Sequence, residues 1–422
     1  MPGAARKAYY SRLREPGAVL RFLAGFDYVQ MVAMALLLGI GVTFIYSTGQ
    51  QVGSPGAGTV YLKQLQWIGC GLAAYFGLAL IDYRRLLIPS VFFYLVCLAL
   101  LMLVFVIGVT VYGAQRWINI PGIGLRLQPS EPTKVAVIAI LSGLFASRMF
   151  AIDEDGGRRR SGQLLGIVTA GIAIAIPFYL IVREPDLGSA LILVPTGAAI
   201  IFVAGLRWKI LSWTIGIALV SFCCILANEF WPRTEVNKQG ESEIVYAGIH
   251  PLLKDYQRER ILTFLDPERD LQHRGYNQFQ ARLAVGTGGM TGKGIGHGTQ
   301  NLLGFLPQSV SNNDFIFAVI AEETGFLGCL GLLSCYILLF YSLIRTAMVC
   351  EEPFGRYLAI GVVTMIFTHC FINIGMSIGI TPVTGVPLPF ISYGGSFVIT
   401  GMVALGLIQS VYRYNIGDRT RD

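Results

Sequence analysis

Long apolar runs recur along this chain of 422 residues, separated by short polar stretches. A helix that crosses a bilayer needs about 20 mostly apolar residues, because each residue advances it by only about 1.5 Å. The pattern therefore predicts an all-α polytopic membrane protein with ten transmembrane helices. The predicted spans are residues 27–47, 64–82, 89–112, 132–149, 163–182, 188–206, 209–230, 314–344, 356–380 and 391–413.

Basic residues fall mainly on one side of these spans. With a cytoplasmic N-terminus, the tail and inner loops carry roughly 18 Lys and Arg residues, against about 5 in the short outer loops. Because inner loops are normally enriched in basic residues, we expect both termini to be cytoplasmic. The predicted organisation is a basic tail over residues 1–26 and one membrane domain over residues 27–422.

The composition supports this class and excludes others. Hydrophobic residues make up 54% of the chain and charged residues 14%, with a mean hydropathy of +0.60. A soluble domain needs roughly a quarter of its residues charged. The net charge of +7 lies mostly in short loops, so it reports orientation and not a nucleic-acid partner. The eight cysteines form no CxxC pair and the four histidines are scattered, so the sequence contains no metal-ligand motif.

One predicted outer loop, residues 231–313 between spans seven and eight, is far longer than the others. Within it, His250–Leu265 mixes apolar and basic residues as a helix would. This helix either lies on the membrane surface or packs on the protein, and the sequence favours neither. Asp266 and Asp270 follow it and would share a helical face. Such carboxylates serve as general bases when held near apolar surface, but are otherwise solvated loop residues.

Three even-numbered spans, which begin at the outer face, start with polar residues. Ser130 and Asp186 are predicted N-caps of spans four and six, and Pro132 suits a first helical turn. Asn312–Asp314 is the corresponding start of span eight. Helix N-termini carry partial positive charge and free N–H groups, so several of them around one cavity favour an anion.

Charged residues accompany these starts. Glu131 and Lys134 are three residues apart and should share one helical face. Ordinary capping explains each start alone, but charge near lipid is costly and usually functional. We therefore predict an anion site at the outer face, formed from Arg116, Glu131, Lys134, Arg183 and Asp186.

The segment Gly379–Ser396 interrupts the last two spans. Its three prolines, at positions 382, 387 and 389, prevent a continuous helix, and Gly394 and Gly395 allow close backbone approach. Irregular backbone at membrane depth is tolerated where it is buried in protein or lines a cavity. We expect this segment to line the outer cavity, with a purely structural loop as the alternative.

These motifs together resemble the SEDS family (shape, elongation, division and sporulation) over nearly the whole chain, and Val383-Thr384-Gly385 resembles its elongation-type branch. Two stretches depart from the family pattern: Leu271–Arg274 replaces a proline and glycine, and Gln308 replaces a glutamate before a two-residue insertion. The matching motifs are GAQRWI at 113–118, LQPSEPTK at 127–134, EPDLGSALIL at 184–193, FLDPERD at 264–270 before Gly275-Tyr276, GTGGMTGKGIGHGTQ at 286–300, FLP at 305–307, DFIFAVIAEETGFLG at 314–328 and NIGMSIGITPVTGVPLPFISYGGS at 373–396.

The resemblance implies a peptidoglycan glycosyltransferase that polymerises lipid II at the outer face of the bacterial cytoplasmic membrane during cell elongation. It places the essential aspartate at Asp270, as the base for an inverting transfer with undecaprenyl pyrophosphate as leaving group. Trp117 would pack on a sugar ring or lipid, or act only as an interfacial anchor. The resemblance implies substrate or pyrophosphate binding by Arg116, Trp117, Glu131, Lys134, Arg183, Asp186, Lys293 and Ser392.

The resemblance also implies partners and a possible ion. Family members work with a class B penicillin-binding protein, and spans eight and nine with the outer loops are candidate contacts. Glu131 and Asp186 would either orient the neighbouring basic residues or hold a divalent cation, Mg²⁺ or Mn²⁺, because a hard ion with oxygen ligands suits a pyrophosphate. Two rival readings are a lipid II flippase and a non-catalytic scaffold. A flippase needs a polar path through the midplane, whereas the ionisable residues here gather at the outer edge.

Overall fold

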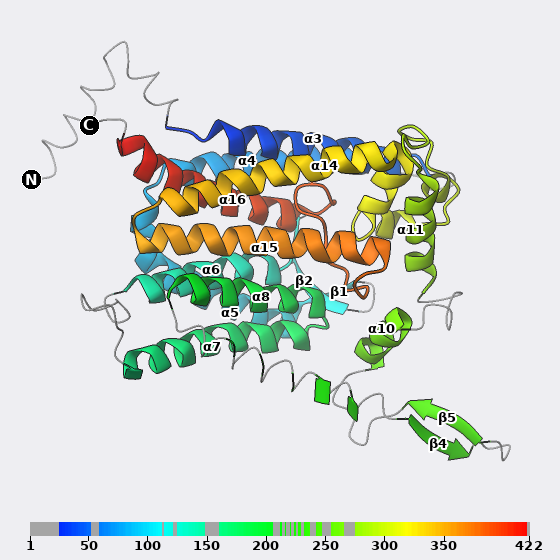
Figure 1. The fold of residues 1–422 in the computed structure, drawn as a ribbon, viewed down its shortest axis with the longest axis horizontal. Coiled ribbons are helices and arrows are strands. Elements are labelled where there is room, and N and C mark those ends of the chain that lie inside the picture. Colours follow the sequence, from blue (N-terminus) through cyan, green and yellow to red (C-terminus); the bar gives the residue numbers. More distant parts are fainter. Residues whose placement is uncertain are drawn as a thin grey trace, which may run out of the picture.

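The computed structural model describes residues 25–51, 59–111, 114–120, 125–147, 160–205, 232–236, 242–246, 255–265 and 275–419, with scattered positions between 212 and 228. The described chain is mostly helical, with short strands at one end of the bundle (Figure 1). The long helices are α3 (Tyr28–Thr48), α4 (Val60–Ala79), α5 (Leu87–Ile107), α6 (Ser130–Ala146), α7 (Arg160–Arg183), α8 (Leu187–Val203), α14 (Ile316–Val349), α15 (Pro353–Ile378) and α16 (Gly395–Arg419). The shorter elements are η2 (Tyr83–Leu86), α10 (Asp255–Leu265), α11 (Tyr276–Thr287), α12 (Thr299–Leu302) and α13 (Gln308–Ser311).

These nine long helices correspond to nine of the ten predicted spans, and the chain is a polytopic membrane protein. The seventh span, 209–230, lies mostly outside the described residues. Six described helical stretches are long and apolar enough to cross a membrane, and α8 is a shorter apolar helix. The helix starts differ from the predicted ones by up to four residues: α4 begins at Val60 instead of residue 64, α6 at Ser130 instead of residue 132, and α16 at Gly395 instead of residue 391.

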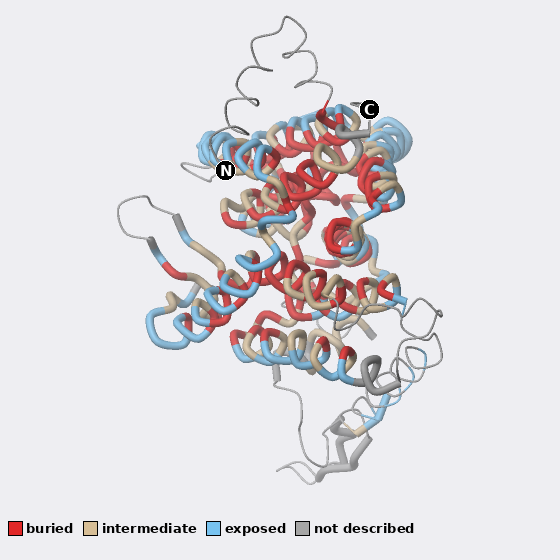
Figure 2. Tube along the Cα trace, turned by 90° about the vertical axis from the view of Figure 1, so that its left-hand side faces the viewer, coloured by how far each residue is buried: buried red, intermediate tan, exposed pale blue. Residues whose placement is uncertain are grey.

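The helices pack side by side with their axes roughly along one direction (Figure 1). α16 lies against α4, where a side chain on Gly406 would come within 2.7 Å of the Tyr75 carbonyl oxygen, so glycine permits this close approach. Tyr75 also donates from its hydroxyl to Gln409 Oε1 at 3.0 Å. Buried residues line the centre of the bundle and exposed ones its periphery (Figure 2). The exposed positions of α5, α7 and α14 include many large hydrophobic side chains, as expected of a lipid-facing surface.

A three-stranded antiparallel sheet joins α5 to α6 at one end of the bundle. Its strands are β1 (Val109–Val111), β2 (Ala114–Ile120) and β3 (Leu125–Leu127), in that order. Trp117 pairs with Val109, and Ile118 pairs with Leu127. The sequence pattern did not predict this sheet. It fixes β2, and with it Arg116 and Trp117, at the end of the bundle where α6 begins (Figure 1).

The segment between α15 and α16 is non-helical, as the prolines predict. α15 ends at Gly379, whose φ of +83° is left-handed and costs glycine little. Residues 386, 388, 390 and 391 are fully buried among the helices. A side chain on Gly41 of α3 would come within 2.6 Å of the Phe390 carbonyl oxygen. This stretch, residues 379–394, is called the re-entrant segment below.

The large predicted loop contains a hairpin, β4 (Pro232–Val236) with β5 (Ser242–Tyr246), and the helices α10 to α13. The predicted helix His250–Leu265 corresponds to α10, with residues 250–254 outside the described residues. Arg260 of α10 donates from Nη1 to the Thr384 carbonyl oxygen at 3.1 Å, so the helix packs on the re-entrant segment. α14 kinks at Gly325, whose φ is +66° and ψ is −163°.

Candidate functional site

Asp186 is the centre of a polar cluster between α6 and α8, at the end of the bundle where the three-stranded sheet lies and which the sequence predicts to be the outer one. As predicted, it caps α8: its Oδ1 accepts from the Ser189 backbone N–H at 3.3 Å. Its Oδ2 accepts from Gln128 Nε2 at 2.8 Å and from Ser130 Oγ at 3.3 Å. The prediction that Ser130 caps α6 was wrong, because Ser130 is the first helical residue and its hydroxyl turns towards Asp186.

Arg116 bridges the sheet to the turn between α7 and α8. Its guanidinium donates to the backbone carbonyls of Glu184, at 3.3 Å, and Pro185. Its Nη1 also lies 3.8 Å from Asp186 Oδ1, and its side chain is 20% exposed. The fork of five N–H donors can hold a turn and still face a ligand. We call Arg116, Gln128, Ser130, Glu184 and Asp186 the outer cluster.

Glu184 is the unusual member of the outer cluster. Its side chain is buried, and neither carboxylate oxygen has a hydrogen-bond partner among the described residues. Burial and, to a smaller extent, the neighbouring Asp186 carboxylate raise the pKa of Glu184 to about 8, with Arg116 opposing the shift. An ionised, unpartnered carboxylate in this position would be costly, so Glu184 is mostly protonated at neutral pH.

Asp314 is a second carboxyl group near this cluster, in the short connection before α14. Burial raises its pKa to about 6, while Arg260 and Arg116 lower it and Asp186 raises it. Its position is fixed by Asn373, which donates from Nδ2 to the Asp314 carbonyl oxygen at 2.8 Å. The predicted cap Asn312–Asp314 was wrong: α14 begins at Ile316, with Phe315 at its N-cap and no capping side chain.

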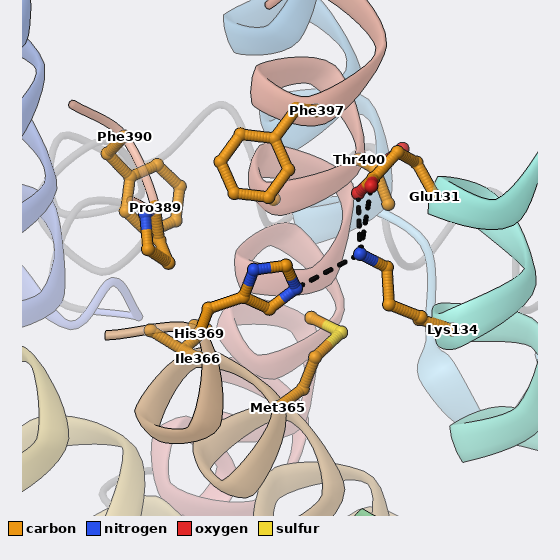
Figure 3. Close-up of a pocket in the computed structure, with 10 residues that line it drawn as sticks. Glu131, Lys134, Met365, Ile366, His369, Pro389, Phe390, Phe397 and Thr400 are labelled. Atoms are coloured by element: carbon orange, nitrogen blue, oxygen red, sulfur yellow. Dashed lines mark hydrogen bonds and ion pairs between the residues drawn. The ribbon is translucent and has the colours of Figure 1, made fainter. Parts of the chain in front are cut away.

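Glu131 and Lys134 form a buried ion pair on α6, as their spacing predicts. Lys134 Nζ lies 2.8 Å from Glu131 Oε2, and both side chains are almost fully buried. Lys134 Nζ also lies 3.0 Å from His369 Nε2 of α15 and 5.8 Å from the Phe397 ring centroid of α16 (Figure 3). The ammonium is therefore surrounded by a carboxylate, an imidazole and an aromatic ring, each from a different part of the chain.

A small pocket adjoins this pair. The re-entrant segment and three helices, α6, α15 and α16, form its walls (Figure 3). The pocket has a volume of about 20 Å³, enough for about one water molecule. A sugar does not fit, so a substrate must meet these groups from the outer cluster's side or after side chains move. The lining residues are Glu131, Lys134, Met365, Ile366, His369, Pro389, Phe390, Phe397, Thr400 and Gly401.

Lys293 lies in a different cluster. Its Nζ is 2.6 Å from Glu322 Oε1 of α14, and the buried Glu322 also accepts from the Gln300 backbone N–H. The neighbouring Glu323, also buried, accepts from Ser47 Oγ at 2.6 Å and from the Gly296 backbone N–H. We call Ser47, Lys293, Glu322 and Glu323 the α14 cluster.

The remaining predicted residues are dispersed. Ser392 is fully buried and serves the backbone, donating to the Asn313 carbonyl oxygen and accepting from the Leu388 N–H. Arg183 is exposed at the end of α7, over the Tyr179 ring at 5.9 Å. Trp117 is half-buried in β2. Asp270 and Asp266 lie outside the described residues, so the proposed base stays a prediction.

The predicted divalent cation would need several oxygen, nitrogen or sulfur ligands held close together. In the described part of the chain no three Asp, Glu, His or Cys side chains come close enough to hold a metal ion. Glu131 is committed to Lys134, and Asp186 to a backbone N–H, an amide and a hydroxyl. The described residues do not fit a protein-held divalent cation, and we derive no step through one.

The sequence pattern of the cell cycle protein family FtsW/RodA/SpoVE matches residues 28–416. The chain belongs to this family. Among the family's curated members, the peptidoglycan glycosyltransferase MrdB of Escherichia coli K12 is 35% identical over 91% of this chain and 92% of its own length. A probable peptidoglycan glycosyltransferase FtsW of Geobacter metallireducens is 31% identical over 93% and 96%.

Solved structures of family members share this fold. A chain from a peptidoglycan synthase complex that coordinates polymerization and crosslinking matches with a TM-score of 0.71 and 28% identity, over 92% of this chain and 98% of that one. The rod shape determining protein RodA of Thermus thermophilus matches with a TM-score of 0.63 and 24% identity, over 92% and 97%. The latter likeness concerns the fold alone.

Three residues of the site were not predicted from the sequence: Glu184, His369 and Phe397. Glu184 belongs to the motif EPDLGSALIL, but no role was predicted for it. His369 and Phe397 lie in apolar spans, and one sequence does not show which side of such a span faces the bundle interior. His369 could have been found, because it is an ionisable residue inside an otherwise apolar run. Ionisable groups within membrane spans usually face the bundle interior.

Proposed function

We propose that this protein polymerises lipid II into glycan strands at the outer face of the bacterial cytoplasmic membrane during cell elongation. Its family and its glycosyltransferase relatives support the reaction class. The observation that carries the assignment is the outer cluster, which gathers a basic fork, a capped helix N-terminus and buried carboxyl groups at one end of an apolar bundle. A substrate with a lipid tail and an anionic head needs this combination.

Charge placement favours polymerisation over transport across the bilayer. In the nine long helices the described Asp, Glu, Lys and Arg residues stand near the helix ends and not in the central turns. A flippase must carry a charged head group through the midplane, where unpaired charge is costly. The chain offers no such path among its described spans.

In the proposed mechanism, Asp270 takes the proton of the acceptor's 4-hydroxyl as that oxygen attacks the anomeric carbon of the growing strand. The bond to undecaprenyl pyrophosphate breaks on the opposite side, which inverts the configuration. Negative charge then builds on the leaving pyrophosphate. Preorganised donors aimed at developing charge are usually the largest catalytic contribution.

The outer cluster supplies those donors in this proposal. Arg116 is held mainly by neutral carbonyl groups, while Asp186, 3.8 Å away, orients it and caps α8. Arg183, exposed at the rim, would make the first contact with the pyrophosphate. Lys134 adds a positive charge from the bundle interior, and in the absence of substrate Glu131 balances that charge. Trp117 follows Arg116 in β2, so its side chain leaves the strand on the opposite face, where it would pack on a sugar ring or on lipid.

We further propose that the protein works with a class B penicillin-binding protein, which would crosslink the strands. The support is the fold shared with a chain of a peptidoglycan synthase complex. The extracytoplasmic location of the site is part of the same proposal and rests on the distribution of basic loops. A divalent cation bound with the substrate remains a prediction that the described residues do not require.

The test is polymerisation of labelled lipid II by the purified protein together with its transpeptidase partner. We expect long glycan strands on a gel from the wild type and none from Asp270→Asn, with Asp266→Asn as the matched control that retains activity. A wild type that moves lipid II between leaflets of proteoliposomes without making polymer would overturn the proposal in favour of transport.

A further inference from the structure

His369 is a buried imidazole within a membrane-spanning helix, and the mechanism above does not use it. Its Nε2 lies 3.0 Å from Lys134 Nζ, and its Nδ1 lies 3.3 Å from the Pro387 carbonyl oxygen. An ammonium group can only donate, so Nε2 must accept. The ring proton is then on Nδ1, which donates to Pro387. The geometry therefore fixes one neutral tautomer.

The surroundings of Lys134 require that tautomer. The ammonium is 1% exposed, and Glu131 supplies the negative charge that balances it. A protonated His369 would place a second positive charge 3.0 Å away in a poorly solvated interior. The groups that face this imidazole from the neighbouring elements are Lys134 and Glu131 of α6 and the Phe397 ring of α16, whose centroid lies 5.1 Å from that of the imidazole.

The bond to Pro387 ties this arrangement to the re-entrant segment. One turn further along α15, Asn373 donates from Nδ2 to the Val386 carbonyl oxygen at 2.8 Å. His369 and Asn373 thus grip two consecutive carbonyls of the segment. The same segment accepts the Arg260 bond at Thr384. A displacement of Lys134 is therefore transmitted through His369 to the segment that α10 packs on.

We propose that His369 is a positioning residue for the transfer reaction: as a neutral imidazole it fixes the Lys134 ammonium relative to the re-entrant segment, so that the charge is directed at the leaving pyrophosphate. This inference rests on the proposed function. The role needs one acceptor and one donor at a set separation, and no exchange of protons. A glutamine side chain offers both groups, whereas leucine offers neither at similar bulk.

The experiment compares His369→Gln and His369→Leu by lipid II polymerisation, with the transpeptidase partner present. We expect His369→Leu to lower kcat by 10- to 100-fold with KM within about 3-fold, since the ammonium loses its register in the transition state. His369→Gln should retain activity within about 3-fold, and its pH–rate profile from pH 6 to 9 should overlay that of the wild type. Cys370→Ala, on the adjacent buried position of α15, is the matched control and should behave as the wild type.

Two outcomes overturn the proposal. If His369→Gln folds with wild-type thermal stability but loses more than 10-fold in kcat, the imidazole acts by proton transfer and not by positioning. If His369→Leu is as active as the wild type, the residue only fills space.

A double variant covers the case in which His369→Leu unfolds: His369→Gln with Lys134→Met should be no slower than Lys134→Met alone. An additional loss in that double variant would contradict coupling through Lys134. A wild type without polymerase activity would instead refute the proposed function.

Discussion

The outer cluster and the α14 cluster both bury carboxyl groups at the same end of the bundle, yet they are satisfied very differently. In the α14 cluster, Glu322 and Glu323 accept from a lysine, a serine and backbone N–H groups. In the outer cluster, both oxygens of Glu184 lack a partner among the described residues, and Arg116 is held largely by backbone carbonyls. Complete pairing stabilises a fold, whereas incomplete pairing leaves groups for a ligand.

The two clusters also differ in their backbone. The α14 cluster is enclosed by a glycine-rich loop: Gly292 has a φ of +75°, and a side chain there would collide with the Glu323 carbonyl. The outer cluster instead sits where a strand, a turn and two helix starts converge. A loop folded tightly around paired charges stabilises the fold. A meeting point of helix starts can bind an anion.

Removing Glu322 should have the largest effect and should fall on stability. Glu322→Ala removes the carboxylate that accepts from Lys293 and from the Gln300 N–H, and each hydrogen bond to a charged group contributes about 1.5–3 kcal/mol. Thermal unfolding in detergent measures the loss. Specific activity per folded molecule should stay within about 3-fold of the wild type; a selective collapse of activity at normal stability would make the α14 cluster, Lys293 included, part of the site.

Asp186→Asn should have the next largest effect, and on catalysis. Asparagine still caps a helix, so stability should fall by only about 1 kcal/mol. The anionic partner of Arg116 is lost, and polymerisation should fall about 100-fold, equivalent to roughly 2.7 kcal/mol. Asp82→Asn is the matched control, because Asp82 is also a capping carboxylate but stands at the opposite end of the bundle, before η2. Equal losses in both variants would contradict a special role for the outer cluster.

Glu184→Gln should change the pH dependence of stability. The native pKa of Glu184 is about 8, against an ordinary value of 4.5, so the native state binds the proton more tightly than the unfolded state. Stability is therefore lost as the pH rises from about 4.5 to 8, by up to about 1.4 kcal/mol per pH unit. The wild type should lose on the order of 2 kcal/mol more than the variant between pH 6 and 8. Parallel melting curves for the two proteins would refute this.

Arg183→Ala should have the smallest effect and would separate the rim of the outer cluster from its interior. The side chain is exposed, so stability should change by less than about 0.5 kcal/mol. KM for lipid II should rise about 2- to 3-fold at low salt, and the difference should vanish at high salt because exposed charges are screened. An effect that persists at high salt would place Arg183 among the buried contacts.

The sequence predicted those features that follow from local chemistry. Apolar length located the described spans, three-residue spacing paired Glu131 with Lys134, and a carboxylate before a helix identified the Asp186 cap. Prolines correctly interrupted the helix after Gly379.

What it missed depends on contacts between distant residues. Ser130 does not cap its helix because Asp186, 56 positions away, offers its hydroxyl a stronger partner. Lys293 is paired with Glu322, and His369 with Lys134, through packing that no local pattern encodes. The sheet around Arg116 is similarly fixed by pairing between strands rather than by strand propensity.

The two helices that flank the proposed base in the sequence, α10 and α11, are both hydrogen-bonded to the same part of the bundle. Arg260 fastens α10 to Thr384, and Gln278 fastens α11 to the Met376 carbonyl oxygen at 3.4 Å. Asp270 is five residues after the last residue of α10 and six before the first residue of α11, and five residues of chain span at most about 18 Å. Both accepting carbonyl groups belong to α15 and the re-entrant segment that follows it. Because both contacts are made to one stretch of chain, residues 376–384, a variant that shifts this stretch would shift both of the helices that flank the proposed base in the sequence.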